Sequence, residues 1–266
     1  AANDGGPFLI AFFVATIVWA VPMLMIEMIM GKTTRQGTIG AFKKFVGPRS
    51  TWMGAWIGFC CIFIMFYYSV VTGWAIRYLT YGVTGVIRKG IDSEALWKHF
   101  TGSPEQTIFF HFIAIGIAAF IIIGGVQKGL ERANKIIVPS IIVLLAILMV
   151  WVLTKPHAVE GLEYLFRPNL AGLLKAKVWL NAFTQAAWSV GAGWGLMLTY
   201  AVYMSDRDDI GANSFVIALA DAGSSLLAAM GILPLVFAVS PSRDVALQAL
   251  QSGDTGLTFI YLAKFF

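Results

Sequence analysis

The chain has 266 residues, of which 58% are hydrophobic and only 12% are charged, and its mean hydropathy is +0.77. A soluble domain carries about a quarter of charged residues, so this composition leaves too little polar surface for a water-soluble particle and predicts a lipid bilayer as solvent. The net charge of +5 would favour a nucleic-acid partner in a soluble protein. Here the basic residues cluster in short loops between apolar segments, as in membrane proteins, so no nucleic acid is expected.

Six segments are long and apolar enough to cross a bilayer as helices, which takes roughly 20 residues each. They lie at 7–31, 51–81, 107–124, 136–153, 178–204 and 210–239, and we expect one transmembrane domain over residues 1–266. Their apolar runs are continuous rather than alternating, which favours an all-α bundle over a barrel. Residues 240–266 are expected to form an extracellular loop. Neither end of the chain resembles a natural terminus, so a longer parent protein is also expected.

Basic residues in the loops predict the orientation of these spans. The connections after the first and third spans hold Lys32, Arg35, Lys43, Lys44 and Arg49, and Lys128, Arg132 and Lys135, respectively. Lysine and arginine concentrate in cytoplasmic loops, so we expect both connections inside the cell and a multi-pass protein of the plasma (inner) membrane. The loops at 87–106 and 155–177 are basic too, which weakens this signal.

Two carboxylates fall inside predicted spans, Glu27 in the first and Asp221 in the sixth. A carboxylate at membrane depth costs several kcal/mol unless it faces protein or a water-filled cavity, which makes each a candidate functional residue. Glu27 is equally compatible with a buried hydrogen-bonding role that involves no ligand.

The second span holds small and sulfur-containing residues that are typical of helix packing. Gly54 and Gly58 have the spacing of a close helix–helix contact. Cys60 and Cys61 are adjacent, so they point in different directions on a helix, and we read both as packing residues with no disulfide, metal or redox role.

The fifth span is interrupted by glycine at positions 191, 193 and 195. Each glycine weakens a helix by about 1 kcal/mol, so three together favour local unwinding. Unwound backbone at membrane depth is tolerated only where it lines a cavity. Close helix packing is the alternative, whereas a dinucleotide loop would need a strand before it and a helix after it.

Four motifs then resemble the neurotransmitter:sodium symporter family. GGPFLI at 5–10, followed by Pro22, Glu27 and Gly31, is similar to family helix 2, and YYSVVTGWA at 67–75 is similar to helix 3. The series Gly125, Lys128, Gly129, Glu131, Lys135 and Pro139 is similar to the loop before helix 5. QAAWSVGAGWG at 185–195 resembles the broken helix 6. The resemblance implies a partial inverted-repeat sodium symporter fold, broken at 191–193 and running from the end of helix 1 to the loop after helix 7.

The resemblance implies a substrate site at the break. Tyr68 would hold the substrate carboxylate, and Ile64, one turn earlier, would touch the substrate side chain. Trp188 would cover the substrate and Trp194 would line the pocket floor. Read without the family, the tyrosine is a packing or interfacial residue and the tryptophans are bulk. Further polar contacts would come from Ser189 and from the backbone at Gly191 and Gly193.

The resemblance also implies ion sites and gating elements. Ser189 and Asp221 would be ligands of a sodium ion, a hard cation that takes oxygen ligands. Glu27 would brace the unwound backbone by accepting its free amides. The cytoplasmic gate would include Tyr203, and the spacing of Gly129 and Pro139 would permit local unwinding and the inward release of sodium.

Chloride-dependent family members hold the anion at five positions, which read Phe12, Gln185, Ser189, Asp221 and Ser225 in this chain. Phe12 lacks a hydroxyl donor, and Asp221 replaces a neutral amide with an acid. We therefore expect sodium ions but no chloride requirement. A protonated Asp221 that stands in for asparagine is the alternative.

Taken together, the residues and the resemblance predict a sodium-coupled symporter that imports a small amino acid, hydrophobic or aromatic, by alternating access. Alternatives are another substrate class on the same fold, an amine or osmolyte, or a channel-like membrane protein. The spans contain no paired acid and base, metal cluster or nucleophile–base pair, so no enzyme is expected.

Overall fold

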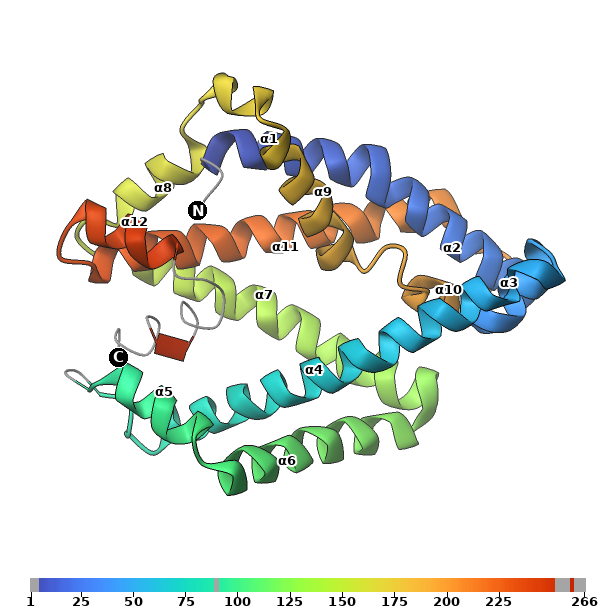
Figure 1. Cartoon of the computed structure of the whole chain (residues 1–266), viewed down its shortest axis with the longest axis horizontal. Helices are drawn as coiled ribbons and strands as arrows, with labels where there is room; N and C mark the ends of the chain where they lie inside the picture. The colour runs from blue at the N-terminus through green and yellow to red at the C-terminus, as the bar shows by residue number, and fades with distance from the viewer. Residues whose placement is uncertain (1–4, 89–90, 252–258, 261–266) are drawn as a thin grey trace. The chain divides into compact units, whose positions relative to one another are not determined.

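The computed structural model describes residues 5–88, 91–251 and 259–260, and among them it contains helices and turns but no strands (Figure 1). The main helices are α1 (Gly5–Ala15), α2 (Val21–Thr34), α3 (Thr38–Phe45), α4 (Thr51–Val83), α5 (Ser93–Thr101), α6 (Pro104–Ile123), α7 (Glu131–Leu153), α8 (Ala158–Phe166), α9 (Ala176–Val190), α10 (Leu196–Ala201), α11 (Ile210–Val239) and α12 (Arg243–Gln251). The π-helical turn η1 (Thr16–Ala20) joins α1 to α2 without a break.

Five helices in the described ranges have the length and apolar character to cross a membrane: Gly5–Thr34, Pro48–Val83, Pro104–Ile123, Lys128–Leu153 and Ile210–Val239. The predicted fifth span, 178–204, is instead two shorter helices, α9 and α10, separated at the glycines. The all-α class and the break at 191–193 are therefore confirmed. In the predicted outer loop, 243–251 form α12, whereas 252–258 and 261–266 lie outside the described residues.

The chain divides into two compact units, which we describe separately. The first, which we call the break unit, comprises Asn3–Ile64 and Glu163–Leu226. The second comprises Met65–Leu162 and Leu227–Phe266, with the two N-terminal residues. Helices α4, α8 and α11 contribute to both units.

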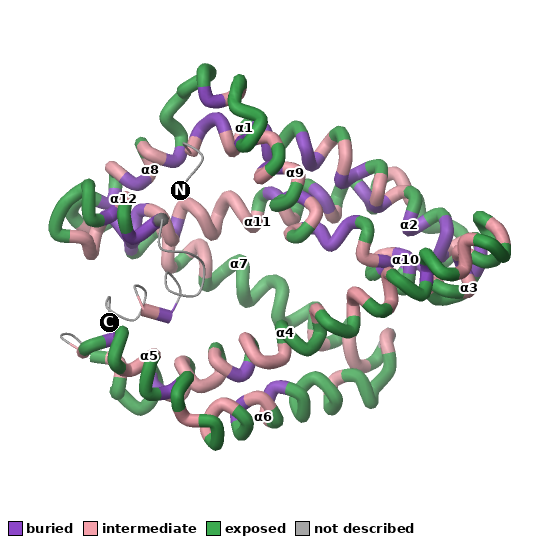
Figure 2. Tube along the Cα trace, viewed as in Figure 1, coloured by how far each residue is buried: buried purple, intermediate pink, exposed green. Residues whose placement is uncertain are grey.

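Small residues let helices approach closely in the break unit. Ala11 and Ala15 of α1 pack against Ala182 and Ala186 of α9, with Phe12 beside them. A side chain at Gly31 of α2 would overlap the carbonyl oxygen of Leu198 in α10. Figure 2 shows buried positions recurring along α1, α2, α9 and α10. The broken segment is thus packed on α1 and α2.

In the second unit, glycines again mark close contacts. A Cβ atom at Gly73 of α4 would lie 2.9 Å from the His111 amide nitrogen of α6. Gly161 of α8 lies against Pro234 of α11 in the same way. Arg77 donates to Gln106 Oε1 at 2.8 Å and stacks over the Tyr81 ring at 4.2 Å, which joins α4 to α6.

Candidate functional site

The break in the fifth segment is produced by three glycines with left-handed backbone. Gly191, Gly193 and Gly195 have φ angles of +69°, +85° and +69°, which side chains with a Cβ rarely adopt. Helix α9 ends at Val190 and α10 begins at Leu196, so residues 191–195 are outside regular helix. The glycines therefore unwind the segment.

The buried carboxylate of Glu27 on α2 takes up the amides that this unwinding frees. Its Oε1 accepts hydrogen bonds from Gly193 N at 2.6 Å and Gly195 N at 3.1 Å, and its Oε2 accepts from Leu198 N at 3.2 Å. Gly195 and Leu198 are buried whereas Gly193 is exposed, and each buried amide left unpaired would cost about 1–3 kcal/mol. Glu27 thus replaces the helix carbonyls that the break removes.

Two tryptophans flank the break. The ring centroids of Trp188 and Trp194 are 4.9 Å apart at an interplanar angle of 51°. The Trp194 indole donates to Ala187 O at 3.3 Å, which ties the residue back to the last turn of α9. Trp188 is 46% exposed among the described residues.

Three oxygen-bearing side chains meet between α9 and α11. The hydroxyls of Ser189 and Ser225 are 3.2 Å apart, and Asp221 lies one turn before Ser225 on α11. Asp221 and Ser225 are four residues apart and so share a helix face. Asp221 Oδ2 is buried and has no hydrogen-bond partner among the described residues. The cluster therefore consists of three oxygen-bearing side chains. The lone pairs of Asp221 Oδ2 accept no hydrogen bond from the described residues and are available to a cation.

The other two predicted ion-site positions are Phe12 and Gln185, both in the break unit. Phe12 is buried in an apolar cluster with Ala186 and Ala222 and stacks on Phe8 at 6.1 Å. Gln185 is exposed on α9. Phe12 therefore supplies an apolar wall, and the contacts of the polar cluster are among Ser189, Asp221 and Ser225.

The remaining predicted residues are not part of this cluster. Ile64 is half-buried on α4 in the break unit, whereas Tyr68, 52% exposed, belongs to the second unit. Tyr203 is exposed just after α10. In the second unit, Gly129 sits in a π-helical turn where a side chain would overlap the Ile121 carbonyl oxygen, and Pro139 lies inside α7.

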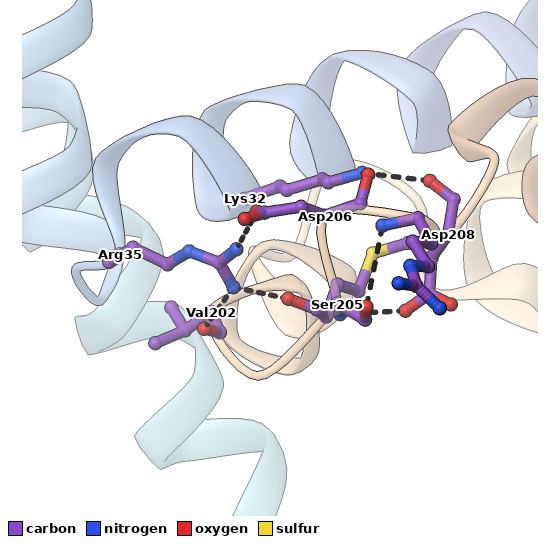
Figure 3. A network of polar contacts seen from close by, with 8 residues as sticks. Lys32, Arg35, Val202, Ser205, Asp206 and Asp208 are labelled. Carbon is purple, nitrogen blue, oxygen red and sulfur yellow. Dashed lines mark hydrogen bonds and ion pairs between the residues drawn. The ribbon is translucent and has the colours of Figure 1, made fainter.

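A polar network follows the C-terminal end of α10 (Figure 3). Arg35 ends α2 in the left-handed conformation (φ 55°, ψ 33°). Its guanidinium donates to the carbonyl oxygens of Val202, at 2.9 Å, and Met204, and it pairs with the Asp206 carboxylate at 2.8 Å. It thus caps backbone carbonyls beyond α10 that have no helical partner.

Lys32, one turn before Arg35, adds two further contacts to this network (Figure 3). Its ammonium donates to Asp206 O at 3.1 Å and Asp208 O at 2.8 Å. From the sequence, Lys32 and Arg35 predicted only the orientation of the spans, and their hydrogen bonds to backbone carbonyls were not predicted. The sequence held a partial signal, because the aspartates at 206, 208 and 209 follow a helix end, where cations are favoured.

Helix α2 therefore holds α10 along its whole length. Glu27 binds amides at the start of α10, Gly31 lies against its middle, and Lys32 and Arg35 bind carbonyls beyond its end. The negative group at the N-terminal end and the positive groups at the C-terminal end both match the helix dipole. Contacts from α2 thus reach both ends and the middle of α10.

Five apolar helices of membrane length and a glycine-broken helix pair braced by a buried carboxylate define a multi-pass helical membrane protein. The sequence model of the sodium:neurotransmitter symporter family matches residues 1–90 and 99–266. The chain belongs to this family, which is a family of plasma-membrane transporters and not of enzymes.

Individual relatives agree with this assignment. The chain is 29% identical to the uncharacterized sodium-dependent transporter MJ1319 of Methanocaldococcus jannaschii over 98% of its own length and 55% of that protein. It is 30% identical to the uncharacterized sodium-dependent transporter YhdH of Bacillus subtilis over 88% of its length and 52% of that protein. The chain thus spans about half the length of these curated relatives.

Among solved structures, the chain is similar to MhsT in complex with L-phenylalanine. The TM-score is 0.83 and the sequence identity 30%, over 99% of this chain and 58% of that one.

A further relative by sequence is the mouse sodium-dependent neutral amino acid transporter B(0)AT3. It is 27% identical over 88% of this chain and 42% of that protein.

Proposed function

We propose that this chain forms part of a sodium-coupled symporter that imports a hydrophobic or aromatic amino acid by alternating access. The observation that carries the proposal is the pairing of a Glu27-braced break with the oxygen cluster of Ser189, Asp221 and Ser225. The break offers backbone groups to a zwitterion, and the cluster offers oxygens to a cation. The two are adjacent in sequence through Ser189 and Gly191.

Sodium is proposed to bind as a co-transported ion at Ser189 and Asp221. Sodium takes oxygen ligands, and the buried Asp221 Oδ2 lacks any other partner in the described part of the chain. An ionised Asp221 would neutralise the ion directly. Further ligands would come from outside this cluster, including the substrate carboxylate.

The substrate is proposed to be an amino acid with a large apolar side chain. Among the described residues, a Cβ at Gly191 would meet Leu196 Cδ1 at 3.3 Å and one at Gly193 would meet Met23 Cε at 3.7 Å, so this part of the chain leaves room beside both glycines. Trp188 and Trp194 supply aromatic surface there. In this proposal Ile64 contacts the substrate side chain and Tyr68 binds its carboxylate. The L-phenylalanine bound to the similar MhsT supports this substrate class.

Substrate class is tested by uptake into liposomes that contain the full-length product of this gene. We expect labelled L-phenylalanine to enter in sodium medium, and unlabelled L-leucine and L-tryptophan to compete. Tryptamine and glycine betaine, which lack either the carboxylate or the primary amine, are expected to compete at least tenfold less well. Stronger competition by either of these two compounds would indicate that the substrate is an amine or an osmolyte and not an amino acid.

Transport is further expected to be independent of chloride, because Asp221 supplies the negative charge beside sodium. Replacing external and internal chloride with gluconate should leave the wild-type rate within about twofold, since no anion must be bound. The double variant Asp221→Asn with Phe12→Tyr should instead lose roughly tenfold or more without chloride, as expected when a charge next to an ion is removed.

The matched control is Asp244→Asn, which removes an exposed carboxylate of α12. It should respond to gluconate as the wild type does. If the wild-type rate collapses without chloride, Asp221 does not carry the compensating charge, and its role is that of a neutral hydrogen-bonding residue.

A further inference from the structure

The peptide group between Trp194 and Gly195 is held at both of its polar atoms. Its N–H, on Gly195, donates to Glu27 Oε1 at 3.1 Å. Its carbonyl oxygen, on Trp194, accepts a hydrogen bond from the thiol of Cys61, with Sγ at 2.9 Å. Cys61 lies on α4 and Glu27 on α2, so two different helices fix one peptide plane inside the break.

The Trp194 carbonyl needs a donor from another helix, because the amide that would bind it in a continuous helix is engaged elsewhere. In a continuous helix the Trp194 carbonyl would accept from the Leu198 amide, four residues later. Here the Leu198 amide donates to Glu27 Oε2 at 3.2 Å instead. The next carbonyl, of Gly195, is already back in the helical pattern and accepts from Thr199 N at 3.1 Å. Cys61 therefore supplies the Trp194 carbonyl with a donor in place of the Leu198 amide, which Glu27 has taken.

Fixing this plane orients the backbone polar groups of the break beside Trp194. Opposite rotations of ψ at Trp194 and φ at Gly195 would turn the plane, and glycine at 195 offers no Cβ to hinder them. The Trp194 indole has its own contacts, to Ala187 O at 3.3 Å and to the Trp188 ring. The ring is thus held from α9, while α2 and α4 hold the peptide plane next to it.

We propose that Cys61 is a positioning residue for substrate binding, which acts by holding the Trp194–Gly195 peptide plane inside the break. This rests on the proposed function, in which Trp194 lines the substrate pocket. We call the hydrogen bonds from Cys61 to Trp194 O and from Gly195 N to Glu27 the clamp. Ile64 lies one turn after Cys61 and on the same side of α4, so the clamp and the proposed substrate contact belong to one helix face. The sequence reading assigned Cys61 and Cys60 alike to packing, and the structure separates them.

The test is equilibrium binding of L-phenylalanine in sodium buffer to the full-length product of the gene. Cys61→Ala should raise the dissociation constant about 3- to 10-fold, the usual effect of losing one neutral hydrogen bond. Cys61→Ser, which keeps a donor, should stay within about twofold of wild type. The matched control is Cys60→Ala, which removes the neighbouring and equally half-buried thiol and should change nothing.

A second pair covers the case in which Cys61→Ala does not fold. Cys61→Thr and Cys61→Val have nearly the same shape and differ in one hydroxyl, so the threonine variant should bind L-phenylalanine more tightly. Equal affinity within whichever pair folds would overturn the proposal. A lower melting temperature for Cys61→Ala with unchanged affinity would likewise reduce Cys61 to a packing residue.

Amide hydrogen exchange measures how firmly the backbone of the break is held, and it needs no ligand. Its result is therefore separate from the proposed function. Amides at 193–198 should exchange faster in Cys61→Ala than in Cys60→Ala or wild type. Faster exchange in a protein that does not bind L-phenylalanine would retain the clamp and reject the substrate. Unchanged exchange would reject the clamp itself.

Discussion

Replacing Glu27 with alanine is expected to abolish transport and to lower the melting temperature of the protein by about 10 °C. Three amides of the break, at Gly193, Gly195 and Leu198, would lose their acceptor at once. Each unsatisfied buried donor costs about 1–3 kcal/mol, and about 1 kcal/mol shifts the melting temperature by roughly 2–4 °C in a protein of this size. The measurements are thermal unfolding in detergent and uptake in liposomes.

The conservative change Glu27→Gln is expected to be intermediate. Its amide oxygen can still accept, but its NH2 group would face backbone donors where Oε1 or Oε2 now accepts. Glu105→Gln is the matched control, because that carboxylate is exposed in the first turn of α6. If Glu27→Ala unfolds and transports like this control, the carboxylate does not hold the break together.

Gly31→Ala is expected to separate α2 from α10 and to reduce uptake at least tenfold. An added Cβ would overlap the Leu198 carbonyl oxygen and lie 2.9 Å from the Ala201 Cβ. Alanine normally stabilises a helix by about 1 kcal/mol relative to glycine, so any loss here reports the helix contact alone. Overpacking against backbone costs about 1–3 kcal/mol or more.

Gly37→Ala provides the control for this substitution. No atom of the residues that the structure describes lies within 4 Å of a Cβ built at Gly37, and its φ of −64° is ordinary for any residue. Expression, melting temperature and uptake should match the wild type. A Gly31→Ala protein that is as stable and active as Gly37→Ala would show that α2 and α10 are not tightly packed in the membrane.

Much of this architecture could be predicted from the sequence, because the helices are set by local composition. Runs of about 20 apolar residues give long helices, and glycines at 191, 193 and 195 give the break, since only glycine accepts that backbone readily. Glu27 stood out because a carboxylate at membrane depth is costly unless it has partners. Each signal lies within one segment of the chain.

The polar partners between segments could not be predicted in the same way. Nothing in the sequence distinguishes Cys61 from Cys60, because the difference is which thiol faces the Trp194 carbonyl after the helices pack. Likewise, Lys32 and Arg35 read as ordinary loop cations until α10 and the residues after it are placed beside α2. Such contacts join residues more than 130 positions apart, so local patterns do not contain them.

The most direct test of the central claim is sodium-driven accumulation of L-phenylalanine. Liposomes containing the full-length gene product are loaded with potassium and diluted into sodium, potassium, or sodium with gramicidin, which collapses the gradient. Coupling predicts that labelled L-phenylalanine rises above its external concentration in sodium alone and only equilibrates in the other two media. Equal uptake in all three media, or accumulation in potassium, would contradict a sodium-coupled symporter.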